Sequence, residues 1–178
     1  MKKFVSPYLD LAALRDAVES ERRRRSLAWQ EVGKQLGIPT IRNMVESSHI
    51  QADAVVLVLQ WLGRRCDEFV VRPGGGSAPW AGREPLPAPP PLFARFDTIL
   101  LHAALDRVRM ERGMTWTEVA AELGTQPGVI ARFTKGGRTN AQLMVAAAEW
   151  ADEPVEALLQ PSHQFLGPAR MDARARAR

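Results

Sequence analysis

The sequence predicts an all-α protein made of two copies of one small helical unit. The first observation is a repeat, because "SLAWQEVGKQLG" at residues 26–37 returns with changes as "GMTWTEVAAELG" at residues 113–124. The second is periodicity. Apolar residues in both copies recur every three or four positions, as on one buried helix face, and no segment shows the β-branched alternation of a strand.

The repeat extends over about sixty positions in which apolar residues match apolar residues. Trp29 falls on Trp116 at an offset of 87, and Trp61 falls on Trp150 at an offset of 89. The first copy is therefore two residues shorter, just after its glycine at position 37. We predict two domains at residues 1–71 and 93–160, a Gly/Pro-rich linker at 72–92, and a basic disordered tail at 161–178.

Each helix of the second copy has its own start or stop signal. Gly113 ends a first helix over residues 93–112, because glycine adopts the left-handed cap conformation at little cost. Thr115 and Glu118 form a capping box that opens a second helix, which ends near residue 124. Pro127 suits the first turn of a third helix, and Asn140 caps a fourth. A short fifth helix is expected near residues 154–159.

The first copy repeats this order, with Ala28 in place of the threonine cap. Its helices are predicted near residues 8–25, 28–36, 40–46, 52–62 and 65–70. Gly and Pro are too dense in residues 72–91 for a helix or a central strand. We expect the Gly/Ser-rich front of this linker to be flexible and its "PLPAPPP" end to form a polyproline II spacer.

Several functional classes leave no trace in the sequence. No apolar run is long enough to span a bilayer, and a single cysteine, Cys66, excludes an internal disulfide. Cys66 matches the apolar Val155, so a buried core thiol is expected. The three histidines lack metal-ligand spacing, and "PGGGSAP" is no P-loop. We therefore expect a cytoplasmic, non-enzymatic protein that needs no metal or cofactor and contacts no membrane.

The pair of short helices around each glycine turn carries a family resemblance. "RGMTWTEVAAELGTQPGVIARFTKG", residues 112–136, resembles the repressor-type helix-turn-helix of the Cro/C1 or XRE group of bacterial and phage regulators. "RSLAWQEVGKQLGIPTIRNM", residues 25–44, resembles a shortened member. The resemblance implies two lambda-repressor-like five-helix domains that bind double-stranded DNA, usually as a two-fold pair, to regulate transcription.

The resemblance also assigns DNA contacts in the second copy. Its base-reading positions open the third helix, where Gln126 can hydrogen-bond base edges and Val129 can touch a thymine methyl. Arg132 lies further along the exposed face and can reach a guanine or a phosphate. Lys135 and Arg138 fall in the loop that the family uses against the DNA backbone. The alternative for Arg132 and Lys135 is an ordinary solvated face.

The first copy keeps fewer candidates, because its two missing residues fall where base readout begins. Thr40, Arg42 and Asn43 are the polar side chains that remain for DNA contact. Trp29 and Trp116 stand where the family often has a phosphate-contacting glutamine. An indole N–H can donate one hydrogen bond to a phosphate, but each ring can equally pack the start of its helix against the core.

The run Arg22–Arg25 closes the first predicted helix. Cations at a helix C-terminus favour the negative end of the helix dipole, and this structural role is preferred over a phosphate contact.

Two functional classes are consistent with the sequence. The first is a sequence-selective, DNA-binding transcriptional regulator. The second is a protein–protein interaction module, adaptor or antitoxin-like, that binds a protein partner or itself and keeps the fold with little base readout. The second is favoured by Pro127 and Gly128 at reading positions, by the deletion, and by an excess of two acidic residues over residues 93–160. The "PLPAPPP" stretch can also serve as a docking segment for a Pro-binding partner.

Overall fold

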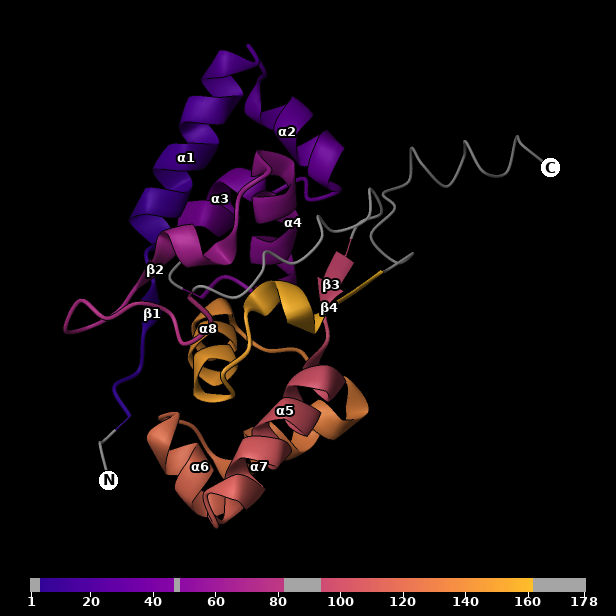
Figure 1. The fold of residues 1–178 in the computed structure, drawn as a ribbon. Helices are drawn as coiled ribbons and strands as arrows, with labels where there is room; N and C mark the ends of the chain where they lie inside the picture. The colour runs from indigo at the N-terminus through magenta and orange to yellow at the C-terminus, as the bar shows by residue number, and fades with distance from the viewer. Residues whose placement is uncertain (1–3, 47–48, 82–93, 162–178) are drawn as a thin grey trace.

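A computed structural model of the protein describes residues 4–46, 49–81 and 94–161 (Figure 1). The predicted tail from residue 162 onward and the "PLPAPPP" half of the predicted linker lie outside these residues. The described chain is mainly α-helical, and its second copy repeats the element order of its first with one added 3-10 turn, η2. The first copy contains β1 (Tyr8–Leu9), α1 (Leu11–Arg24), α2 (Trp29–Leu36), α3 (Ile41–Glu46), α4 (Ala52–Leu62), the 3-10 helix η1 (Cys66–Phe69) and β2 (Val70–Val71). The second contains β3 (Ala94–Phe96), α5 (Thr98–Glu111), α6 (Trp116–Glu122), α7 (Pro127–Ala131), η2 (Arg132–Lys135), α8 (Ala141–Trp150), η3 (Val155–Leu158) and β4 (Leu159–Pro161).

The expectation of an all-α chain is wrong at the ends of each copy. β1 pairs antiparallel with β2, and β3 pairs antiparallel with β4. The first helices consequently begin later than predicted, after the capping residues Asp10 and Asp97, whose carboxylates accept from Ala13 N at 2.9 Å and from Ile99 N at 2.8 Å. Strands of two or three residues are too short to show alternation in a sequence. The predicted fifth helices are single 3-10 turns leading into the closing strands.

The shortened turn of the first copy requires a glycine within α2. A Cβ atom at Gly33 would lie 2.8 Å from the carbonyl oxygen of Ile38. The second copy has two more residues with which to turn away, and it carries the buried Ala120 at the matching position. The deletion and Gly33 are therefore two parts of one structural adjustment.

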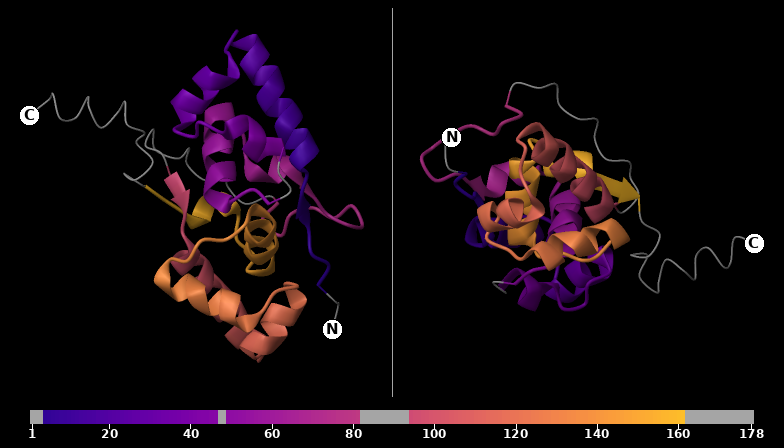
Figure 2. Two further views of the ribbon diagram at one scale, coloured as in Figure 1. Left: turned by 180° about the vertical axis from the view of Figure 1, so that it is seen from behind. Right: turned by 90° about the horizontal axis from the view of Figure 1, so that it is seen from below.

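The two copies pack together through α4 and α8, which lie side by side in the middle of the molecule (Figures 1 and 2). Seven residues of α4 and eight of α8 are buried, so both helices are apolar on nearly all sides. A helix of that kind must be enclosed by protein. The buried side chains of both copies accordingly form one continuous hydrophobic cluster.

Equivalent residues meet across this junction. Ala52 N–H donates to Thr139 O at 3.0 Å, and Ala141 N–H donates to Ile50 O at 2.9 Å. When each residue is replaced by its counterpart at the offset of 89, either of these bonds becomes the other. Such reciprocity is the signature of an isologous contact, in which residue i meets j and j meets i. The copies are thus arranged around a local pseudo-two-fold axis.

The front of the predicted linker is anchored rather than flexible. Trp80 is 7% exposed, and its indole N–H donates to Asp67 Oδ2 at 3.0 Å. Arg72 lies over the Trp80 ring and pairs with Glu149 of the second copy at 2.9 Å. An aromatic side chain with a polar partner can hold a Gly-rich loop in place despite its composition.

Candidate nucleic-acid interface

The sequence correctly predicts the capping residues and the glycine turn that define the helix pair α6–α7. Thr115 Oγ1 accepts from Glu118 N at 3.3 Å, and Glu118 Oε2 accepts from Thr115 N at 2.7 Å, so both halves of the capping box form. Gly124 has a φ of 62°, in the left-handed region that allows a sharp turn between the helices. In the first copy only one half of the capping box forms, because Ala28 has no side-chain oxygen. Its N–H donates to Glu31 Oε2 at 2.8 Å.

The segment from α7 to the loop after η2 has one buried face and one exposed face. Ile130 and Phe133 point into the core and are 1% and 0% exposed. Val129 is half-buried against the core. The other predicted contacts, Gln126, Arg132, Lys135 and Arg138, are all exposed. The structure therefore brings the five predicted residues of the second copy onto one continuous segment.

The cations of this segment are not neutralised by the protein. Of the Lys and Arg side chains that the structure describes, five form no hydrogen bond or ion pair, and four of these belong to the second copy. The chain has no carboxylate between residues 123 and 148 that would compensate them. An uncompensated basic patch is the electrostatic feature that attracts phosphates. The four cations are Arg95, Arg132, Lys135 and Arg138.

Arg95 is the member that sequence reasoning missed. It lies in β3, and its Nη2 comes within 3.8 Å of where a Cβ on Gly136 would stand, so it adjoins the loop that carries Lys135 and Arg138. Its Nε is buried without a hydrogen-bond partner among the described residues. No local pattern signals this position, because β3 reaches the loop only through the folded chain.

The run Arg22–Arg25 lies at the C-terminal end of α1, as predicted, and its guanidiniums are ion-paired. Arg22 and Arg23 pair with Glu19, and Arg24 and Arg25 pair with Glu21, all at 2.6 Å. These hydrogen bonds hold the pKa of Glu19 and that of Glu21 at about 2, below their usual value near 4.5. All four guanidiniums are therefore ion-paired within the first copy, and the two carboxylates balance two of their four charges.

Trp29 and Trp116 pack against their own copies, as one of the two proposed roles requires. Their rings are half-buried and packed, with Arg22 5.4 Å above Trp29 and Arg109 5.1 Å above Trp116. His102 also stacks on Trp116, at 4.7 Å between ring centroids. Neither indole N–H has a partner among the described residues, whereas the other three tryptophans each donate to a side-chain oxygen. Each ring thus anchors the start of its helix and leaves one donor available.

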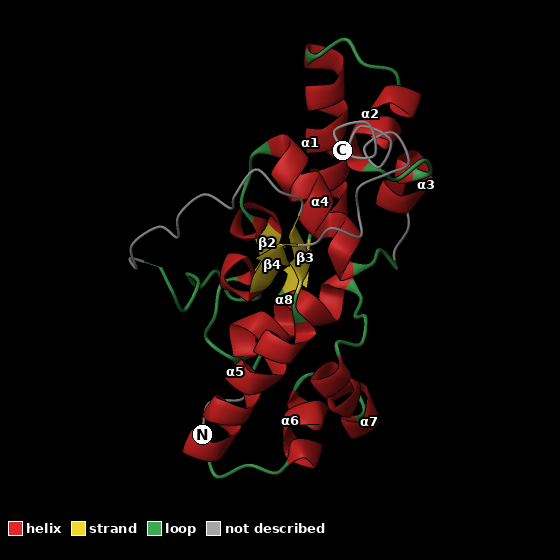
Figure 3. Cartoon of the chain, turned by 90° about the vertical axis from the view of Figure 1, so that its right-hand side faces the viewer, coloured by secondary structure: helices red, strands yellow, loops and turns green. Residues whose placement is uncertain are grey.

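The candidates of the first copy lie on a separate element. Thr40 directly precedes α3, and Arg42 and Asn43 lie in its first turn, all three exposed. The buried Ile41 fixes the opposite face of this helix. In Figure 3, α3 and α7 lie toward the same edge of the molecule, one above the other. The two helices that carry these candidates therefore lie toward a common edge, each on its own copy.

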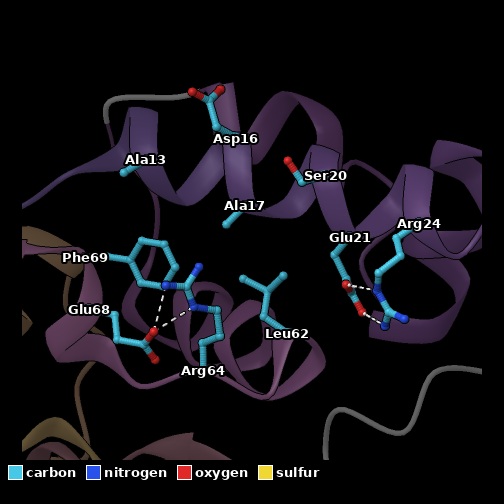
Figure 4. Close-up of a pocket in the computed structure, with 10 residues that line it drawn as sticks. All are labelled: Ala13, Asp16, Ala17, Ser20, Glu21, Arg24, Leu62, Arg64, Glu68 and Phe69. Atoms are coloured by element: carbon cyan, nitrogen blue, oxygen red, sulfur yellow. Dashed lines mark hydrogen bonds and ion pairs between the residues drawn. The ribbon is translucent and has the colours of Figure 1, made fainter.

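A groove between α1 and η1 was not anticipated (Figure 4). Its floor is apolar, with Ala17, Leu62 and Phe69. Each charged side chain that lines it is already paired: Asp16 with Arg15, Glu21 with Arg24, and Arg64 with Glu68. The groove therefore presents no uncompensated acid or base.

Cys66 is 1% exposed, and burial raises the pKa of its thiol, which confirms the expected core position. Within the described ranges, no three His, Cys, Asp or Glu residues gather where they could hold a metal ion. In the same ranges, no helix has the length and apolar character to cross a membrane.

Comparison of the chain with protein-family models, with curated proteins and with solved structures finds no match.

Proposed function

We propose that the chain is a sequence-selective, double-stranded-DNA-binding transcriptional regulator of the repressor-type helix-turn-helix class. In this proposal residues 1–71 and 93–160 are two lambda-repressor-like domains, and α2–α3 and α6–α7 are their helix-turn-helix pairs. The protein acts in the cytoplasm, has no enzymatic activity and uses no cofactor. The observation that carries the proposal is the cluster of uncompensated cations Arg95, Arg132, Lys135 and Arg138 beside α7.

The mechanism follows from the positions of these side chains. α7 enters the major groove, with Gln126 placed to hydrogen-bond a base edge and Arg132 to reach a guanine or a phosphate. Lys135, Arg138 and Arg95 neutralise phosphates beside it and fix its register. The available indole N–H of Trp116 donates to a further phosphate oxygen. The half-buried Val129 offers only part of its surface to a thymine methyl.

The pseudo-two-fold arrangement supports a duplex as the ligand. Helix-turn-helix dimers present two recognition helices to successive major grooves about 34 Å apart along one face of the DNA. Here α3 and α7 lie toward a common edge of one chain (Figure 3). The packed junction between α4 and α8, rather than the reach of the linker, sets their separation.

The test is a salt series on binding to a fluorescent pool of random-sequence duplexes, measured by anisotropy between about 50 and 200 mM salt. Each phosphate contact contributes about 0.9 to the slope of log affinity against log salt. The double variant Arg132→Ala/Lys135→Ala should therefore reduce the magnitude of the slope by about 1.8 and weaken binding.

A matched control removes the same charge elsewhere. Arg23 and Arg24 are 74% and 70% exposed but ion-paired, so Arg23→Ala/Arg24→Ala should leave the slope unchanged. Failure of the folded wild-type chain to bind any duplex at about 50 mM salt would overturn the proposal. An equal loss of slope in the control would show that α7 has no special role.

The protein-interaction module stays as a second candidate because of α5. Ile99, Leu100 and Met110 on its outer face are 50%, 44% and 66% exposed, whereas the matching residues of α1 include Arg23 at the position of Met110. Exposed apolar side chains on one helix face favour a protein contact, here a second copy of this chain. Sedimentation velocity tests self-association at this face: Ile99→Lys/Met110→Lys should abolish a concentration-dependent dimer, and a wild-type chain that stays monomeric would exclude it.

A further inference from the structure

The two copies share one geometry but differ in the chemistry of their matched positions. Arg132 matches Asn43, Lys135 matches Glu46, Arg138 matches His49, and Arg95 matches Tyr8. Four positive charges beside α7 thus stand against one negative charge and no positive one at the same places beside α3. Because phosphate contacts supply a large share of the affinity of a protein for DNA, this difference falls on a major energetic term.

The backbone of the first copy differs at the same place. α7 begins at Pro127, whose counterpart is Ile38, but α3 begins only at Ile41. The first turn of the reading helix is therefore missing. Gln126, the side chain best suited to read a base in the second copy, has no counterpart because it falls in the deletion.

Two exposed cations of the first copy, at positions where the second copy has Ala121 and Ala131, offset only part of this loss. The run Arg22–Arg25 is held by Glu19 and Glu21. Lys34 and Arg42 are the exposed cations that the first copy retains on α2 and α3. The first copy can therefore lie against a duplex, but it lacks the phosphate-binding and base-reading groups that the second copy has.

We infer that one chain binds duplex DNA asymmetrically: the second copy reads a single half-site, and the first copy covers the adjacent turn without reading its sequence. This inference rests on the proposed function. It specifies the DNA partner as a site without an inverted repeat, although the protein has pseudo-two-fold symmetry. A symmetric helix-turn-helix dimer would instead select two inverted half-sites about 10 base pairs apart.

Selection of tightly bound sequences from a random duplex pool, followed by sequencing, tests the inference with the full chain. The expected result is one short enriched motif with no inverted repeat, bound by one chain per duplex. An enriched motif with two inverted half-sites would overturn the inference while supporting the proposed function. Failure to bind any duplex would overturn both.

Variants of matched positions separate the copies. Arg132→Ala/Arg138→Ala should weaken binding to the selected site at least tenfold, whereas Thr40→Ala/Asn43→Ala should change it less than twofold. Equal losses in the two variants would overturn the inference. The converse variant, Asn43→Arg/His49→Arg, places on the first copy the charges of the second at exposed positions. It should strengthen binding and steepen the salt slope by up to about 1.8. An unchanged slope would mean that the first copy does not lie against the duplex.

Discussion

Substitution of Gly33 by alanine tests the structural account of the shortened turn. The added Cβ would lie 2.8 Å from Ile38 O and 3.3 Å from Pro39 Cα, where ordinary contacts begin at 3.4 Å. The Ile38 carbonyl cannot move easily, because its oxygen accepts from Ile41 N at 3.1 Å and its own N–H donates to Gly33 O at 2.8 Å. Relief of the clash therefore disturbs the start of α3.

The expected magnitude follows from three opposing effects. Overpacking costs about 1–3 kcal/mol, and loss of the hydrogen bond that opens α3 costs about 1 kcal/mol. Alanine is favoured over glycine within a helix by about 1 kcal/mol. The net expectation for Gly33→Ala is a loss of about 2 kcal/mol in the free energy of unfolding, or about 4–8 °C in Tm.

Reversible urea unfolding followed by circular dichroism measures this loss. Ala120→Gly is the matched control, for which only the helix preference of about 1 kcal/mol and a methyl-sized cavity are lost. A third variant inserts Thr-Gln between Gly37 and Ile38, as in the second copy, together with Gly33→Ala. This insertion should restore stability to within about 1 kcal/mol of the parent. A neutral or stabilising effect of Gly33→Ala alone would refute the close-approach argument.

Three further predictions concern local structure. Ser26 has a φ of 54°, in the left-handed region, where its counterpart is Gly113. Ser26→Gly should therefore raise the free energy of unfolding by about 0.5–1 kcal/mol, and Gly113→Ser should lower it. Urea unfolding midpoints measure both changes. Thr115→Ala removes half of the capping box and should cost about 1 kcal/mol by the same assay, and no loss would contradict the cap. Because the folded pKa of Glu19 is lowered, its ion pair stabilises the fold fully above about pH 4.5, and this contribution disappears as pH falls toward 2. Carboxyl titration by NMR should place Glu19 near 2, with a rise in Arg22→Ala, and a wild-type midpoint above 4 would contradict the pairing.

The helices of the second copy were predictable because their boundaries are set by nearby residues. The capping box of Thr115 and the caps at Gly113 and Asn140 act within four residues of themselves, so a sequence window contains the whole interaction. The strands were not predictable for the opposite reason. Ala94 pairs with Pro161 across the length of the second copy, and nothing in either short segment indicates its partner.

The candidate site likewise contains residues that local sequence predicts and one that only the tertiary fold brings in. Gln126, Arg132 and Lys135 lie within one short segment around α7 and η2, where the family resemblance assigns them, and all three are exposed. Arg95 joins the group from a strand whose position depends on tertiary contacts. The mutual packing of the copies was likewise hidden, although α4 and α8 are more apolar than a one-faced helix needs to be. That excess of apolar residues was the available signal for a second buried face.

The reciprocal bonds between Ile50–Ala52 and Thr139–Ala141 have a consequence for inheritance. In an assembly of identical subunits, one codon specifies both partners of such a contact, so every substitution is imposed twice. In this chain each partner has its own codon. One half can therefore lose or gain a side chain while the other is unaffected, as the pair Asn43 and Arg132 already shows.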